Sequence, residues 1–110
     1  MFKTIVSTTE FEDLRMERPA LLAWFSTLEC NVCKVLKPKV GEMVASCFPA
    51  MTMVYTEINA LPDLAARYRV FSVPTLLVFF EGREYIRKSR TFSLEELQED
   101  IARLVARMEE

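Results

Sequence analysis

The stretch that decides the fold is Ala20-Leu-Leu-Ala-Trp-Phe-Ser-Thr-Leu-Glu-Cys-Asn-Val-Cys-Lys34. Residues 20–25 are all apolar and do not alternate with polar residues, which is typical of a strand covered on both faces in a parallel sheet. Two cysteines, Cys30 and Cys33, follow where a helix is expected to begin. We therefore interpret this stretch as a buried strand that delivers two cysteines to the start of a helix.

The spacing of Cys30 and Cys33 indicates redox chemistry. Two intervening residues on the first turn of a helix bring both sulfur atoms within disulfide reach. Unpaired amide groups and the positive end of the helix dipole favour the thiolate of the first cysteine, which is the form that attacks disulfides. Beside a strand–helix pattern, such a Cys-x-x-Cys pair is typical of a dithiol oxidoreductase. Cys30 is therefore the candidate nucleophile, and Cys33 is the candidate resolving thiol.

Other uses of the cysteines stay open at this point. A zinc site within one chain needs two more Cys or His ligands, but the sequence has no His and only one other cysteine, Cys47. A zinc or iron–sulfur site shared between two chains, or two inert helical cysteines, would also fit the spacing. We predict that the protein uses no metal and no cofactor. Cys47 falls on the apolar stripe of its helix, so we expect it to be buried and unreactive.

Length, composition and charge restrict the class of protein. A chain of 110 residues, 51% of them apolar, predicts one globular domain over residues 1–110. The 14 basic and 16 acidic residues give a net charge of −2, which provides no electrostatic footprint for nucleic acid or an anionic membrane. No run approaches the ~18 apolar residues of a spanning helix, and the N-terminus lacks the apolar core of a signal peptide. We expect a monomer in the cytoplasm, where a reducing environment suits one dithiol pair and a spare cysteine.

The rest of the chain alternates predicted strands and helices. Strands are expected over residues 2–6, 20–26, 51–58, 75–80 and 84–90, and helices over 9–17, 31–47, 62–68 and from 94 onwards. Capping boxes that start at Thr9 and Ser93 begin the first and last helices, and Pro38 should kink the second. The second helix should bury one apolar stripe: Val32, Val35, Leu36, Val40, Met43, Val44 and Cys47. The order β-α-β-α-β-α-β-β-α predicts an α/β fold with a central mixed sheet flanked by helices.

Over nearly its whole length the sequence resembles the thioredoxin family. The resemblance rests on positions that match the family's motifs without gaps between them: Lys34 after the second cysteine, Pro38 at the helix-kinking proline, Pro62 at the third-helix proline, Ser72-Val73-Pro74-Thr75 at the cis-proline motif and Gly82 at the hairpin glycine. It implies the thioredoxin fold, protein disulfides as substrates and an upstream reductase as electron donor. It also implies a cis Val73–Pro74 bond that faces the dithiol, with the Val73 backbone pairing with an extended substrate peptide.

Two aromatic residues depart from the family pattern near the resolving cysteine. Trp24 stands where thioredoxins bury an aspartate beneath that cysteine, and Tyr55 stands at the position of the paired lysine. A buried carboxylate can accept the proton of Cys33 during resolution, whereas an indole offers only an N–H donor. The resemblance therefore implies that the usual proton relay is missing. Simple packing of both aromatic rings in the core is the alternative interpretation.

Departures at the rim of the site bear on partner choice. Glu29 replaces the tryptophan that precedes the first cysteine, Asn31-Val32 replace a glycine–proline pair, and Arg90 replaces a glycine that borders the substrate groove. Glu29 and Arg90 could form a charged rim that selects polar partners, or they could be a solvated surface pair. Two functions follow: a thioredoxin-like thiol–disulfide oxidoreductase, or a thioredoxin-fold protein-interaction module with weak or no redox turnover.

Overall fold

The computed structural model describes residues 2–108 and confirms the predicted order of elements. Within these residues the elements are β1 (Phe2–Thr4), α1 (Thr8–Glu17), β2 (Ala20–Ser26), α2 (Asn31–Cys47), β3 (Thr52–Glu57), α3 (Pro62–Arg67), β4 (Thr75–Phe80), β5 (Arg83–Ser89) and α4 (Leu94–Met108). The strands form one mixed sheet in the order β1-β3-β2-β4-β5, with β1 and β2 parallel to β3 and with β4 antiparallel to both β2 and β5. The central strand is thus β2, as the apolar run predicts.

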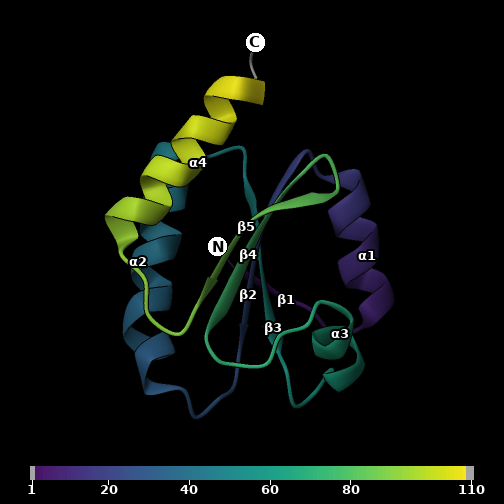
Figure 1. Ribbon diagram of the computed structural model, residues 1–110. Coiled ribbons are helices and arrows are strands. Elements are labelled where there is room, and N and C mark those ends of the chain that lie inside the picture. Colours follow the sequence, from purple (N-terminus) through teal and green to yellow (C-terminus); the bar gives the residue numbers. More distant parts are fainter. Residues whose placement is uncertain (1, 109–110) are drawn as a thin grey trace.

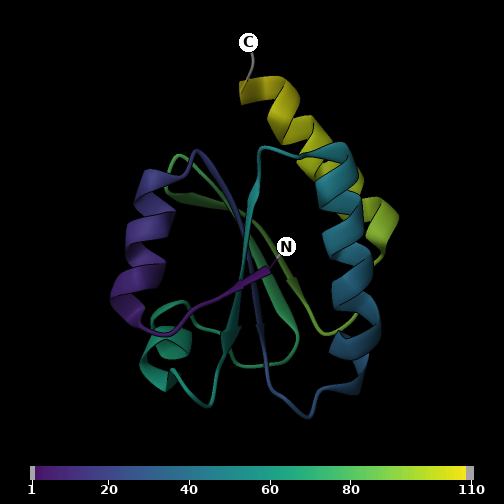
Figure 2. The ribbon, with the colours of Figure 1, turned by 180° about the vertical axis from the view of Figure 1, so that it is seen from behind.

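Helices cover both faces of the sheet. Helices α2 and α4 lie on one face, and α1 and α3 lie on the other (Figures 1 and 2). Successive side chains of a strand point to opposite faces, so β2 contributes to two separate cores. Leu22 and Trp24 pack on the side of α2 and α4, while Leu21, Ala23 and Phe25 pack on the side of α1 and α3. All five side chains are fully buried, which explains why this strand shows no alternation in its sequence.

The N-cap of the first helix lies two residues earlier than predicted. Ser7, not Thr9, is the N-cap, and its hydroxyl accepts a hydrogen bond from the Glu10 N–H at 3.1 Å. The Glu10 carboxylate in turn accepts the N–H of Val6 at 2.8 Å. The prediction was wrong here because residues 7–10 also carry a serine and a glutamate at capping-box spacing. The predicted cap at Ser93 is confirmed, since its hydroxyl accepts the Glu96 N–H at 3.2 Å.

Helix α2 buries a narrower stripe than predicted. Val40, Met43 and Val44 are buried together with Cys33 on the sheet side, and the helix contains Pro38. Three other members of the predicted stripe are exposed: Val32 (46%), Val35 (62%) and Cys47. With about 100° of rotation per residue, Val35 lies nearly opposite Cys33, and Val32 lies on the flank of the helix. Cys47 is the last residue of α2, and its sulfur lies 3.4 Å from the Gln98 Nε2 atom.

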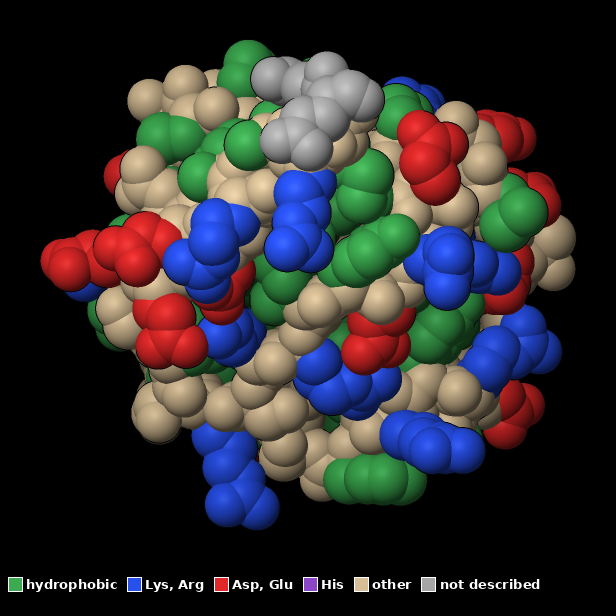
Figure 3. All heavy atoms as spheres, turned by 45° about the horizontal axis from the view of Figure 1, so that its top comes forward, with side chains coloured by type: hydrophobic (Ala, Val, Ile, Leu, Met, Phe, Trp, Pro, Cys, Tyr) green, Lys and Arg blue, Asp and Glu red, His purple; other side chains and the backbone are tan. Residues whose placement is uncertain are grey.

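Charges are intermixed on the visible surface. On the face shown in Figure 3, Lys and Arg side chains lie among Asp and Glu side chains, and neither sign forms a continuous patch. Basic and acidic residues, which are nearly equal in number in the sequence, are therefore also mixed on this face. Separately, none of the helices within residues 2–108 has the length and apolar character needed to cross a membrane.

Candidate active site

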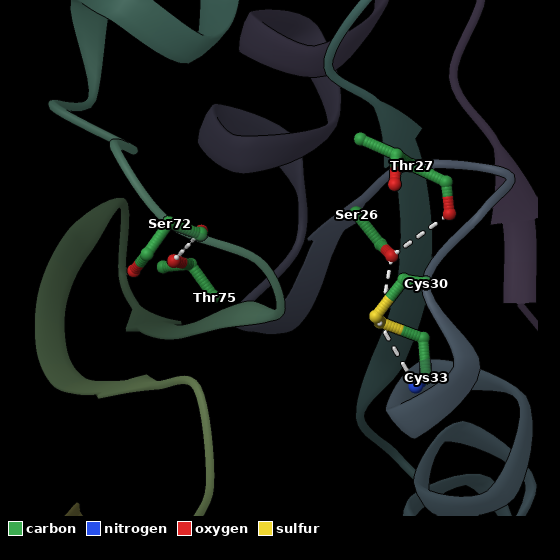
Figure 4. The surroundings of a disulfide bond; sticks show 6 residues. All are labelled: Ser26, Thr27, Cys30, Cys33, Ser72 and Thr75. Carbon is green, nitrogen blue, oxygen red and sulfur yellow. Dashed lines mark hydrogen bonds between the residues drawn. A yellow bond between two sulfur atoms is a disulfide. The ribbon is translucent and has the colours of Figure 1, made fainter.

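The two cysteines lie where the central strand gives way to a helix. Strand β2 ends at Ser26, and α2 begins at Asn31, directly after Cys30. Cys30 is the N-cap of α2, and its sulfur accepts the backbone N–H of Cys33 at 3.3 Å (Figure 4). A capping side chain accepts a hydrogen bond from one of the backbone N–H groups that have no partner inside the helix. The first turn of α2 contains no acidic residue, so its dipole can stabilise a negative charge at this end.

Cys30 and Cys33 are joined by a disulfide, and their Cα atoms are 5.3 Å apart. The two sulfur atoms differ in their surroundings. Cys30 is half-buried, whereas Cys33 is only 6% exposed and belongs to the apolar core between the sheet and α2. A molecule that approaches from solvent therefore reaches Cys30 first.

A buried hydroxyl contacts Cys33. The Ser26 side chain is fully buried, and its Oγ lies 2.7 Å from the Cys33 sulfur and 3.2 Å from the carbonyl oxygen of Thr27 (Figure 4). Sequence reasoning treated Ser26 only as the end of a strand. Its position two residues after Trp24 could have revealed the contact, because residues i and i+2 of a strand share one face.

A cavity of about 420 Å³ adjoins the disulfide. Its lining includes both cysteines and residues from β1, β2, α2 and β3: Thr4, Ser26, Thr27, Leu28, Cys30, Cys33, Lys34, Lys37, Pro38 and Tyr55. The Lys37 ammonium lies 4.1 Å from the ring centre of Tyr55 and 5.1 Å from that of Phe2. Partial burial lowers the pKa of Lys37. Sequence reasoning also missed Lys37, although it follows Cys33 by four residues and so neighbours it on the helix surface.

Trp24 and Tyr55 lie side by side on β2 and β3, on the face that α2 covers. Trp24 is fully buried in the same apolar cluster as Cys33, and its ring packs edge-on against Phe2 and Phe92 at centroid distances of 6.4 and 6.2 Å. Its indole N–H has no hydrogen-bond partner among the residues that the structure describes. Burial, and to a smaller extent the charge of Glu57, raises the pKa of Tyr55. Neither Trp24 nor Tyr55 can replace a carboxylate as the proton acceptor of the resolving cysteine.

The loop that precedes β4 lies beside the disulfide (Figure 4). The Val73–Pro74 peptide bond is cis, Pro74 is buried and Val73 is half-buried. The Thr75 hydroxyl donates to the carbonyl oxygen of Ser72 at 2.7 Å, and the Arg90 N–H donates to that of Pro74 at 2.7 Å. The end of β5 is thereby tied to the cis-proline loop.

The two charged residues predicted at the rim do not form an ion pair with each other. Glu29 and Arg90 are both exposed, and the ion pairs of the described residues do not include one between them. Arg90 has a positive φ of 65°, a left-handed conformation that favours glycine. This backbone geometry explains why glycine would suit the position.

Exposed apolar side chains occur on the segments that carry the disulfide and the cis proline. Leu28 (74% exposed) lies in the loop before Cys30, Val32 and Val35 lie on the first turns of α2, and Phe71 (86% exposed) directly precedes the cis-proline loop. A shallow hollow of about 470 Å³ continues this surface toward Phe92. Contiguous exposed apolar groups, such as those that line this hollow, indicate a surface on which another molecule is bound.

Comparisons with known proteins agree with the fold and the cysteine pair. The family model for thioredoxin matches residues 3–103. The chain is 35% identical over 83 residues to a thioredoxin of Chlamydia trachomatis, covering 76% of this chain and 79% of that protein. It is 26% identical over 98 residues to thioredoxin-like protein YdfQ of Bacillus subtilis, covering 89% and 87%. The oxidised form of mitochondrial thioredoxin 3 from Saccharomyces cerevisiae superposes with a TM-score of 0.82 at 21% identity, over 92% of this chain and 93% of that one.

Proposed function

The chain belongs to the thioredoxin family, and from this premise we propose that it reduces or exchanges protein disulfides through Cys30 and Cys33. The observation that carries the proposal is the asymmetry of the pair. Cys30 is half-buried at the N-terminus of α2, while Cys33 is almost completely buried behind it. Attack on an external disulfide needs an accessible thiolate, and resolution needs only a neighbouring thiol.

In the first step the Cys30 thiolate attacks one sulfur of a substrate disulfide. A bond forms between Cys30 and that sulfur, and the other substrate sulfur leaves as a thiolate and takes up a proton from water. The amide of Cys33, which points at the Cys30 sulfur from 3.3 Å, can stabilise the anion before the attack. The helix terminus thus prepares Cys30 for the role of nucleophile.

In the second step Cys33 attacks the Cys30 sulfur and displaces the substrate as a thiol. The product is the Cys30–Cys33 disulfide, whose Cα separation of 5.3 Å lies within the usual range for such bonds. Another turnover requires an upstream reductase that returns two electrons to the pair. A reducing compartment such as the cytoplasm would suit this cycle.

The apolar surface around Cys30 supports a protein substrate. Leu28, Val32, Val35 and Phe71 can bury apolar side chains of an unfolded or flexible segment, which is a favourable, non-directional contribution to binding. The backbone of Val73, next to the cis proline, would pair with that segment as an added strand. Glu29 and Arg90 stand at the edge of this surface and would act on partner selection separately, not as an ion pair.

One observation favours a second function, a protein-interaction module with weak redox turnover. Among residues 2–108, the lining of the cavity beside Cys33 contains no Asp or Glu, so the described residues offer no carboxylate there to take the proton of the resolving thiol. Slow resolution would prolong the mixed disulfide with a partner. The module and the enzyme would then share one binding surface and differ in the rate of the second step.

The proposal is tested by the reduction of insulin disulfides with dithiothreitol as the electron source, in a Cys47→Ser background. This background removes the exposed third thiol. The parent should accelerate the reaction, Cys30→Ser should abolish the acceleration, and Cys33→Ser should accumulate a mixed disulfide at Cys30 that mass spectrometry detects. If Cys30→Ser formed the mixed disulfide through Cys33 as quickly, the assigned roles would be wrong. Slow turnover with normal formation of the mixed disulfide would favour the interaction module.

A further inference from the structure

The hydroxyl of Ser26 can serve both protonation states of Cys33. It has a single hydrogen and two acceptors in reach, the Thr27 carbonyl oxygen at 3.2 Å and the Cys33 sulfur at 2.7 Å. When Cys33 is a thiol, its S–H can donate to the hydroxyl oxygen while the hydroxyl donates to Thr27. When Cys33 is a thiolate, the hydroxyl can turn and donate to the sulfur. A hydrogen bond to an anion is about twice as strong as one between neutral groups, so the contact favours the thiolate.

We propose that Ser26, assisted by Lys37, is a positioning residue that stabilises the thiolate of Cys33, so that resolution proceeds without a neighbouring carboxylate base. Ser26 acts through a direct hydrogen bond, and it is fully buried. In a buried site, where the effective dielectric constant is low, one fixed donor has a larger effect on an anion than it has in solution. The catalytic consequence rests on the proposed function, but the acidity of Cys33 does not.

Lys37 adds a positive charge to the same cavity. It follows Cys33 by one helical turn, and its ammonium lies over the Tyr55 ring at 4.1 Å. Because this ammonium is partly removed from water, which lowers its pKa, a nearby thiolate would stabilise its charged form and be stabilised in return.

The other titratable groups around Cys33 do not supply a base. Lys34 lines the cavity from α2, and the Tyr55 hydroxyl does so from β3. Glu57 is paired in register with Ser26, but its carboxylate accepts the Ala60 N–H at 2.8 Å. Glu29 is exposed in the loop before Cys30. The groups that line the cavity with Cys33 are therefore neutral or cationic, which favours an anion at Cys33.

The resolving step then balances without a fixed proton acceptor on the protein. The Cys33 thiol gives its proton to water, and the thiolate is held by the Ser26 hydroxyl. The Cys33 sulfur attacks the Cys30 sulfur, the Cys30–Cys33 bond forms, and the bond from Cys30 to the substrate sulfur breaks. The substrate leaves as a thiolate with the electron pair and is protonated by water.

The test measures the acidity of Cys33 directly. In a Cys30→Ser, Cys47→Ser background Cys33 is the only thiol, and its thiolate is followed by absorbance at 240 nm against pH. Ser26→Ala should raise the measured pKa by about one to two units, the shift expected on loss of a hydrogen bond to a charged group. Ser26→Thr, which keeps a hydroxyl, should restore most of the lost acidity. Lys37→Met keeps the packing against Tyr55 and should also raise the pKa.

A matched control removes a different buried hydroxyl. Thr56 lies on the neighbouring strand and is fully buried, and its Oγ1 has no hydrogen-bond partner within the described part of the chain. Thr56→Val should therefore leave the titration of Cys33 unchanged. An unchanged pKa in Ser26→Ala would overturn the role of Ser26, and an unchanged pKa in Lys37→Met would overturn that of Lys37. If Ser26→Ala does not fold, the smaller change Ser26→Cys, which replaces the hydroxyl by a weaker donor, is titrated by difference from Cys33 and should likewise raise the pKa of Cys33. If the pKa shifts while the parent fails to reduce insulin, the proposed function fails and the role of Ser26 stands.

Discussion

Replacement of Arg90 by glycine should stabilise the fold. Arg90 has a φ of 65° and is held there by its N–H bond to the Pro74 carbonyl oxygen. The left-handed conformation costs a residue with a Cβ about 1–2 kcal/mol. Glycine removes this cost but gives the unfolded chain extra freedom, a loss of about 0.4–1 kcal/mol. We expect a net increase of about 0.5–1 kcal/mol in the free energy of unfolding, or about 2–4 °C in Tm for a domain of this size.

Arg90→Ala is the matched control, because it also removes the exposed side chain but keeps the Cβ. Its stability should stay within about 0.5 kcal/mol of the parent, as for most surface substitutions. Urea unfolding of both variants, followed by far-UV circular dichroism, separates the effect of the backbone from that of the side chain. A lower stability of Arg90→Gly than of Arg90→Ala would contradict this expectation, since the positive φ would then carry no cost.

Two other predictions concern buried groups. Disulfides quench nearby indole emission, and Trp24 shares a buried cluster with Cys33. Reduction of the disulfide should therefore raise the fluorescence of Trp24 without changing the far-UV circular dichroism. Identical fluorescence spectra in both redox states would contradict a contact between Trp24 and the disulfide. Burial alone would raise the pKa of Glu12, but hydrogen bonds from Arg15 and Tyr68 outweigh it, and the pKa is lowered from 4.5. Glu12 therefore stabilises the fold fully above pH 4.5 and loses this effect as the pH falls through the lowered pKa. Glu12→Gln should be less stable at pH 7 and lose less stability on acidification than the parent in urea titrations, and parallel pH profiles would contradict this.

The fold was predictable because its strongest signals are local in sequence. The apolar run at residues 20–25, the prolines and the helical stripes determine each element through burial and backbone constraints. The errors occurred where one pattern has two solutions. Ser7 and Thr9 both start capping-box sequences, and the apolar residues of α2 are too many for one face, so that Val32 and Val35 point to solvent.

The site was only partly predictable from the sequence. The Cys-x-x-Cys spacing identifies the cysteines because their chemistry depends on residues close in the chain. The contact between Ser26 and Cys33 joins a strand to a helix, and it depends on the angle at which α2 crosses the sheet. The apolar hollow beside the start of α2 likewise combines Val32 and Val35 of that helix with Phe92 from the segment before α4. Residue types alone do not give such arrangements, whereas a shared face, such as that of Trp24 and Ser26, narrows the choices.

Trp24 and Ser26 together provide an alternative to a buried carboxylate beside Cys33. A carboxylate at position 24 would be buried without a paired charge, at a cost of several kcal/mol, whereas Trp24 fills that space with an apolar ring and leaves a single N–H unpaired. The polar partner of Cys33 is instead Ser26, which lies two residues after Trp24 at the end of β2. A neutral hydroxyl costs less to bury than a carboxylate, and its ability to donate does not change with pH near neutrality. In the proposed arrangement the core therefore keeps its apolar packing, and the acidity of Cys33 does not depend on a carboxylate that titrates in the same cavity.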